Sequence, residues 1–189
     1  MRRFAFVCIA LGLWACSPAP APSTSGSPSP VEAASCAEPC PAASATSGPF
    51  KLELVLPRVD WKSDEPLTGT VTLSYAGPKA TTLFGSAGLM NFQYTQVGGP
   101  HRTSPVSTSE CGRYEIGPTT PMSTALSKSG GFTDEDPDAA WLRSFLTAPD
   151  VRLPAGTWDV TALADFTEGD SCGAGGRSMA ATVRVTVSD

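Results

Sequence analysis

Apolar and polar residues alternate along four segments of the chain with a period of two, which is typical of a strand with one face on a core. The four segments span 50–56, 67–75, 158–166 and 179–187. Shorter candidates, bounded by Gly-Pro, Gly-Gly-Pro and Ile-Gly-Pro breaks, span 80–84, 89–97, 111–116 and 122–126. Seven or eight short strands at this spacing predict an all-β, two-sheet sandwich for residues 49–189.

One segment has the period of a helix. Asp136 can cap it, and Pro137 suits the first helical position. The apolar stripe that follows consists of Ala140, Trp141, Leu142, Phe145 and Leu146. The pattern predicts one short helix over about 137–146 that packs across an open end of the sandwich.

The segment 153–158, Leu-Pro-Ala-Gly-Thr-Trp, predicts a tight turn with Pro154 at its second position and Gly156 where φ can be positive. It resembles the turn before the penultimate strand of many immunoglobulin-like extracellular domains. The resemblance covers about the last 40 residues and the order of strands elsewhere, and it implies an immunoglobulin-like sandwich. Where such domains place a tyrosine that bonds back to the loop, this chain has Trp158, which can donate only through its indole nitrogen.

The N-terminus has the form of an export signal. Arg2 and Arg3 make a positive start, and the uncharged run 4–15 has the length of a signal-peptide apolar region. This run is too short to span a bilayer, which needs roughly 20 apolar residues. The sequence therefore predicts a signal peptide over residues 1–15.

The end of this signal, Leu-Trp-Ala-Cys at 13–16, resembles the lipobox of bacterial lipoproteins. The resemblance implies cleavage before Cys16 and a diacylglyceryl thioether on its sulfur, whose acyl chains would hold the protein to a membrane of the cell envelope. The domain would face the periplasm or the exterior. An ordinary cleaved signal, an uncleaved apolar N-terminus and a twin-arginine signal are the alternatives.

Residues 16–48 are rich in Pro, Ser and Ala, and Val31 is the only large aliphatic residue between positions 17 and 47. Such a segment cannot bury enough apolar surface to offset its ordering entropy. It predicts a disordered tether, which its prolines would keep extended at about 3.1 Å per residue.

The chain has six cysteines. Once Cys8 leaves with the signal and Cys16 is acylated, an even number remains in an oxidising compartment, where disulfides are expected. Of the three possible pairings we favour Cys111 with Cys172 and Cys36 with Cys40. A metal or redox site is the alternative for the second pair, although no histidine lies nearby.

The charge excludes one class of partner. Acidic residues number 18 and basic residues 13, for a formal net charge of −5. Because affinity for a phosphate backbone depends on clustered Lys and Arg, and the bases here are scattered, nucleic acid is disfavoured. The acidic surplus is interpreted as a contribution to solubility.

One motif invites a catalytic interpretation. Residues 169–173, Gly-Asp-Ser-Cys-Gly, resemble the Gly-Asp-Ser-Gly-Gly around the nucleophile of trypsin-like proteases, and the sole histidine, His101, precedes them. That fold needs two barrels and far more residues, and Cys172 replaces the second glycine of the motif. We therefore favour a glycine-rich hairpin loop pinned by a disulfide, and predict no catalytic residue and no cofactor.

An acidic run places Asp134, Asp136 and Asp138 at alternate positions, as calcium loops do. It departs from an EF-hand, because Ala139 stands where glycine is needed and Phe145 where the bidentate glutamate would lie. We favour a solvated loop with a helix cap and no metal site. His101, beside Gly-Gly-Pro, is expected to be an exposed loop side chain.

Together these observations predict a membrane-anchored envelope lipoprotein whose sandwich is a non-enzymatic binding module for a protein or an envelope polymer. The expected contacts lie in the segments 97–110 and 167–177 and in the helix with its acidic approach. The candidate residues are His101, Arg102, Asp134, Asp136, Asp138 and Arg177. The strand pattern and the Pro-x-Gly turn also look loosely similar to BsuPI-type proteinase inhibitors, which makes an inhibitor the alternative; a hydrolase is a weaker one.

Overall fold

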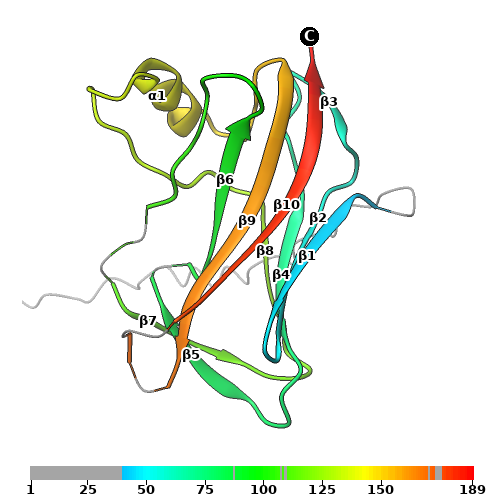
Figure 1. Cartoon of the computed structure of the whole chain (residues 1–189), viewed down its shortest axis with the longest axis vertical. Coiled ribbons are helices and arrows are strands. Elements are labelled where there is room, and N and C mark those ends of the chain that lie inside the picture. The colour runs from blue at the N-terminus through cyan, green and yellow to red at the C-terminus, as the bar shows by residue number, and fades with distance from the viewer. Residues whose placement is uncertain (1–39, 87, 107, 109, 170, 173–175) are drawn as a thin grey trace, which may run out of the picture. The chain divides into compact units, whose positions relative to one another are not determined.

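The computed structural model describes residues 40–189, except 87, 107, 109, 170 and 173–175 (Figure 1). The predicted signal peptide, Cys16 and most of the tether lie outside the described residues. No helix among the described residues is long and apolar enough to cross a membrane. The elements are β1 (Ala42–Ser47), β2 (Phe50–Val55), β3 (Asp60–Lys62), β4 (Thr70–Tyr75), β5 (Thr81–Gly85), β6 (Met90–Gln96), β7 (Gly112–Ile116), β8 (Met122–Ala125), α1 (Ala139–Thr147), β9 (Gly156–Glu168) and β10 (Arg177–Ser188).

The strands form two sheets. One has the order β1-β2-β4-β8, and the other has the order β3-β10-β9-β5-β7, with β6 paired to β9 as well. The pairs are antiparallel except for β3 and β10, which are parallel. The predicted all-β, two-sheet sandwich with one short helix is confirmed.

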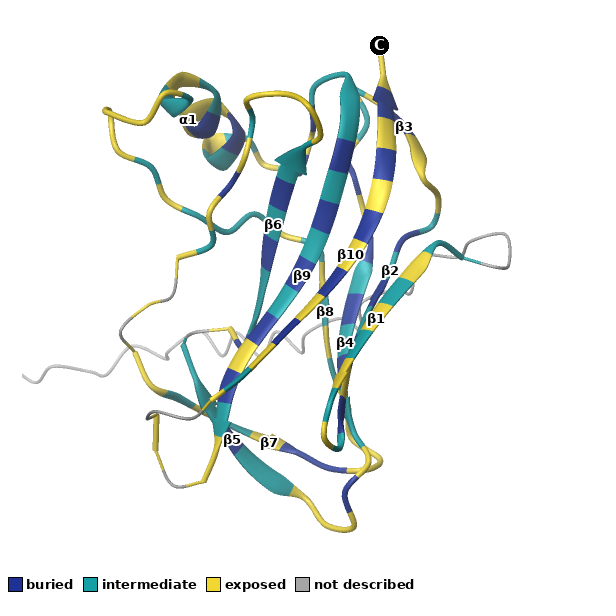
Figure 2. Cartoon of the chain, in the orientation of Figure 1, coloured by how far each residue is buried: buried dark blue, intermediate teal, exposed yellow. Residues whose placement is uncertain are grey.

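The core lies between the sheets because alternate residues of the long strands point inward. Figure 2 shows this as alternating buried and more exposed bands along β9 and β10. Trp158 and Tyr94 are the largest side chains that are fully buried. Each predicted alternating segment supplies a strand of the sandwich, so period-two patterning determined most of the fold.

Strand β1 corrects the predicted boundary between tether and domain. It lies inside the segment assigned to the tether, and it pairs with β2 from Ala42↔Val55 to Ser47↔Phe50. Its inward side chains, which include Ala43 and Ala45, are small but pack against the core. The domain therefore begins before Pro49, because backbone pairing and small side chains are sufficient for this strand.

Strand β3 is the second addition to the predicted set. It carries one inward apolar side chain, Trp61, and pairs with the last residues of β10. A single buried residue leaves no alternation to detect. With β1 and β3, the described part of the chain has ten strands rather than seven or eight.

Helix α1 begins two residues later than predicted. Asp138, not Asp136, is its N-cap residue, and the Asp138 side chain makes no capping hydrogen bond. Asp136 instead accepts a hydrogen bond from the Thr133 N–H at 2.6 Å and so closes a turn ahead of the helix. Pro137 therefore lies before the helix rather than at its first position.

The chain bends at Ala155, directly before β9. Gly156 has the positive φ that was predicted, 146°, which residues with a Cβ rarely adopt. The Trp158 indole N–H donates to the Pro154 carbonyl at 2.9 Å. A tryptophan thus makes the link back to the loop that a tyrosine hydroxyl makes in the domains this turn resembles.

Candidate functional site

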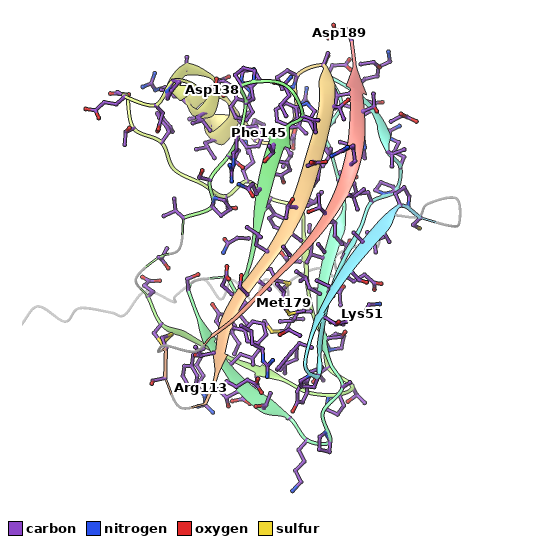
Figure 3. All side chains as sticks on the ribbon, viewed as in Figure 1. Lys51, Arg113, Asp138, Phe145, Met179 and Asp189 are labelled. Atoms are coloured by element: carbon purple, nitrogen blue, oxygen red, sulfur yellow. A yellow bond between two sulfur atoms is a disulfide. The ribbon has the colours of Figure 1, made fainter. Side chains whose placement is uncertain are left out.

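The predicted contact segment 97–110 has residues at both ends of β9: His101 lies near the start of the strand, and Glu110 lies near its other end, where the segment 167–177 follows. The Gln96 N–H donates to the His101 carbonyl at 2.8 Å, and Gln96 pairs with Trp158 near the start of β9. The segment 169–176 follows the other end of this 13-residue strand, which at about 3.3 Å per residue lies roughly 40 Å away. We call these the helix end, which holds α1 and His101, and the disulfide end, which holds Cys111 and Cys172. Figure 3 labels Asp138 and Phe145 at the helix end and Arg113, on β7, at the other.

At the helix end, His101 is held on two sides. Its Nδ1 lies 2.7 Å from Asp138 Oδ2, and its ring stacks on Trp141 with centroids 4.6 Å apart. The Trp158 ring lies nearly parallel at 6.2 Å. The prediction of an exposed loop side chain is wrong, since the His101 side chain is only 24% exposed. Aromatic stacking and the carboxylate draw it onto the helix.

Aromatic packing and hydrogen bonds also hold the rest of α1 against the sandwich. The Trp141 and Phe145 rings stack at 5.1 Å, and Tyr94 meets Phe145 edge-on at 5.5 Å. Lys128 Nζ donates to the carbonyls of Phe145 and Ala148 at the helix C-terminus. Burial lowers the pKa of this amine, and the nearby Asp150 carboxylate opposes that shift. The helix end therefore uses its polar groups to hold the helix in place.

The acidic run does not converge on a common point. Asp134 pairs with Arg143, Asp136 accepts from Thr133, and Asp138 binds His101. Among the described residues, no group of three or more His, Cys, Asp or Glu side chains could hold a metal ion. These candidate residues thus act in local hydrogen bonds and ion pairs.

The candidate residue Arg102 and the serine of the protease-like motif, Ser171, lie apart. Arg102 is exposed and makes an isolated backbone bridge to Thr95. Ser171 follows β9 at the disulfide end, where its carbonyl accepts from the Thr167 hydroxyl at 3.0 Å. Because His101 lies at the helix end, the structure does not bring Ser171 and His101 together as a protease-like pair.

At the disulfide end, the predicted Cys111–Cys172 bond is present, with Cα atoms 5.8 Å apart. It joins the segment before β7 to the loop between β9 and β10. Cys40 also takes part in a disulfide, and Cys36, its predicted partner, lies outside the described residues. The first of the two favoured pairings is confirmed.

A cavity of about 410 Å³ lies beside this disulfide. Phe84 on β5 contributes apolar surface, while Glu110, Asp165 and Arg177 contribute charge. Parts of both predicted loops meet here, since Glu110 comes from the first and Arg177 from the second. The volume is within the range of small-ligand and side-chain pockets, about 300–1,000 Å³.

The charges of the cavity are unevenly neutralised. Arg177 pairs with Glu168 at 2.5 Å, donates to Ser47 Oγ at 3.2 Å and lies over the Phe50 ring. Glu110 and Asp165 have no ion-pair partner among residues 40–189 as described. The guanidinium is thus committed to holding β1 against β10, and the two free carboxylates make the cavity net acidic.

Sequence reasoning overlooked Asp165. It stands at an outward position of the alternating segment 158–166, where a carboxylate is typical of the solvent face of a strand. Its sequence position contains no signal that Glu110 would lie on the same cavity, because that requires knowledge of the loop path. The disulfide prediction, which joins the two regions, was the one available clue.

Comparison with known proteins identifies no relative for this chain. No family model matches it, and no curated protein does. Among solved structures, the sporulation control protein Spo0M from Bacillus subtilis is 16% identical with a TM-score of 0.39. The match covers 76% of this chain and 51% of Spo0M, so this chain spans about half of that protein. Similarity at this level does not establish a shared function.

Proposed function

We propose that this protein is an envelope lipoprotein, anchored through acyl chains on Cys16, whose sandwich binds a partner at the disulfide end without catalysing a reaction. One observation carries the binding proposal: both predicted contact loops meet at a 410 Å³ cavity with two carboxylates that no described cation neutralises. The anchor proposal rests on the lipobox residues 13–16.

The chemistry of the cavity favours a particular partner. Phe84 offers apolar surface, and Glu110 and Asp165 attract a cation. A segment with a lysine or arginine next to an apolar side chain would satisfy both, because the alkyl part of a basic side chain packs on aromatic surface while its charge meets a carboxylate. An amine-bearing envelope polymer would use the same charges. Exposed carboxylates of this kind increase the association rate and select against anionic partners.

Charge removal tests the binding proposal. We expect the full chain to capture a partner from detergent-solubilised envelopes, and the Glu110→Gln/Asp165→Asn variant to bind it at least tenfold more weakly. Asp64→Asn is the matched control, because Asp64 is also an exposed carboxylate but does not line the cavity. Equal binding by all three proteins would overturn the proposal, and stoichiometric inhibition of a protease would favour the inhibitor alternative.

Acylation tests the anchor separately. Cells fed radiolabelled palmitate should label the wild-type protein but not Cys16→Ser, and the variant should leave the membrane fraction. Wild-type protein found in the cytosol with Met1 attached and its thiols reduced would contradict the anchor.

A further inference from the structure

Among the described residues, no strand pairs with the outer edge of β8. In an antiparallel ladder, successive residues turn their backbone groups alternately toward one neighbour and the other. Leu126, directly after β8, donates its N–H to the Gly69 carbonyl at 3.0 Å, so Met122 and Thr124 face β4 in the same way. The backbone groups of Ser123 and Ala125 therefore face away from the sheet, where the Ala125 carbonyl accepts a long hydrogen bond of 3.4 Å from the Thr124 hydroxyl.

Strand β6 has an open position next to this edge. Its outward groups are filled along most of its length: Tyr94 exchanges hydrogen bonds with Thr103, and Phe92 with the Ser129 hydroxyl. The alternation makes Met90 the next outward residue. Among the described residues, the structure shows no hydrogen-bond partner for its outward N–H and C=O.

A groove of about 400 Å³ lies between these two edges. Met90 of β6 and Met122 of β8 line it, together with Leu89 and Tyr114. The Tyr114 hydroxyl is held by the Ser86 carbonyl and the Gly88 N–H, each at 3.0 Å. The groove thus has one fixed aromatic wall and two methionines, which adapt readily to the shape of an incoming apolar side chain.

Strand β8 lacks the charged side chains that the outer strands β3 and β7 carry. Residues 116–127 contain no charged side chain, whereas β3 carries Asp60 and Lys62 and β7 carries Arg113 and Glu115. Strand β1, at the far edge of the same sheet, lies against β10. Natural proteins use charge or cover to prevent unwanted pairing at such edges. An edge that is neutral and beside an apolar groove is suited to pairing.

We propose that β8 binds an extended, uncharged segment of a partner protein by strand addition, with alternate apolar side chains of that segment in the groove. The outward groups of Ser123 and Ala125 supply main-chain hydrogen bonds, and the groove supplies side-chain selectivity. Among the described residues that line it, the groove contains no charged side chain and so offers no counter-ion to one. It therefore favours an uncharged segment over a charged one. The site is distinct from the disulfide-end cavity.

Synthetic peptides test this proposal on the full chain in detergent micelles. The probe is a capped nine-residue peptide with valine at alternate positions and threonine or serine between them. We expect it to shift the amide resonances of Met90, Ser123 and Ala125. Matched peptides that are N-methylated at alternate residues, or that carry glutamate at two valine positions, should bind at least tenfold more weakly.

Ser123→Pro is the informative variant, because it removes an outward N–H and leaves the β4 ladder intact. It should weaken binding of the neutral peptide at least tenfold, while Ser123→Ala should not, and Glu110→Gln/Asp165→Asn should have no effect. If Ser123→Pro does not fold, the N-methylated peptide still tests whether binding depends on main-chain hydrogen bonds. Equal binding of the N-methylated peptide, or no binding of the neutral one, overturns the proposal. If the protein does not bind the peptide but self-associates, and Ser123→Pro abolishes this self-association, the proposal is overturned. The edge of β8 would then pair with a second copy of this chain.

Discussion

At the helix end, His101, Asp138 and Lys128 all bond to neighbouring groups, whereas at the disulfide end Glu110 and Asp165 have no ion-pair partner among the described residues. Stacked aromatic rings fill the first region, and a cavity of about 410 Å³ lies in the second. The comparison shows that residue type alone does not indicate function. The histidine and aspartates that look most reactive in the sequence hold a helix, while two ordinary carboxylates border the cavity.

The largest expected effect concerns the disulfide end. Replacing Cys111 and Cys172 by serine should lower the free energy of unfolding by about 4 kcal/mol, because the bond joins residues 61 positions apart and restricts the unfolded chain. Urea denaturation of the variant and the wild type measures this. A loss below about 1 kcal/mol would mean that the loops are held mainly by other contacts.

Trp141→Ala tests the helix end. It removes the ring that stacks on His101 and Phe145, and we expect a loss of about 3 kcal/mol, near the lower limit for large aromatic residues because Trp141 is only partly buried. Ser144→Ala, on the exposed face of the same helix, is the control and should change the stability by less than about 0.5 kcal/mol. Similar losses of unfolding free energy in both variants would contradict the proposal that this ring cluster holds α1 in place.

Alkaline pH gives a smaller effect with a defined sign. Burial raises the pKa of Tyr94 above its ordinary value, so the folded protein holds this proton more tightly than the unfolded chain. This contribution to stability is complete below pH 10 and is lost as the pH rises further.

Tyr94→Phe should therefore be about 1 kcal/mol less stable than wild type at pH 7, because it lacks the hydrogen bond to the Ser127 carbonyl. The difference should shrink above pH 10. Lys128, whose pKa is lowered, changes the stability in the opposite direction with pH, but equally in both proteins. Urea midpoints at pH 7 and pH 11 test this, and a constant difference would contradict it.

The smallest effect on stability is expected for Glu110→Gln/Asp165→Asn. Both side chains are exposed and without an ion-pair partner among the residues described. The free energy of unfolding, measured by thermal denaturation, should therefore change by less than about 0.5 kcal/mol. A larger loss would indicate a structural role and weaken their assignment to binding.

The sequence predicted the strands that carry alternating apolar side chains, the helix to within two residues and the Cys111–Cys172 bond. It did not reveal β1, whose inward residues are small, or β3, which has one buried residue, Trp61. Both depend on backbone pairing with distant strands, which leaves little trace in composition.

The candidate site was less predictable. The contact segments were identified, but the meeting of Glu110 and Arg177 at one cavity, away from His101, was not, because loop position depends on strand order. His101 was misplaced since its partners, Asp138 and Trp141, lie 37 and 40 residues later in the chain. Such contacts follow from tertiary packing rather than from local pattern.

Site-specific photo-cross-linking tests the central claim, that the disulfide end is the binding surface, most directly. Ser178 lines the cavity and Ser144 lies on α1, and both are exposed serines. With a benzophenone amino acid at either position in intact cells, we expect a partner adduct at position 178 and none at position 144. An adduct at position 144 alone would contradict the account and move the binding surface to the helix end.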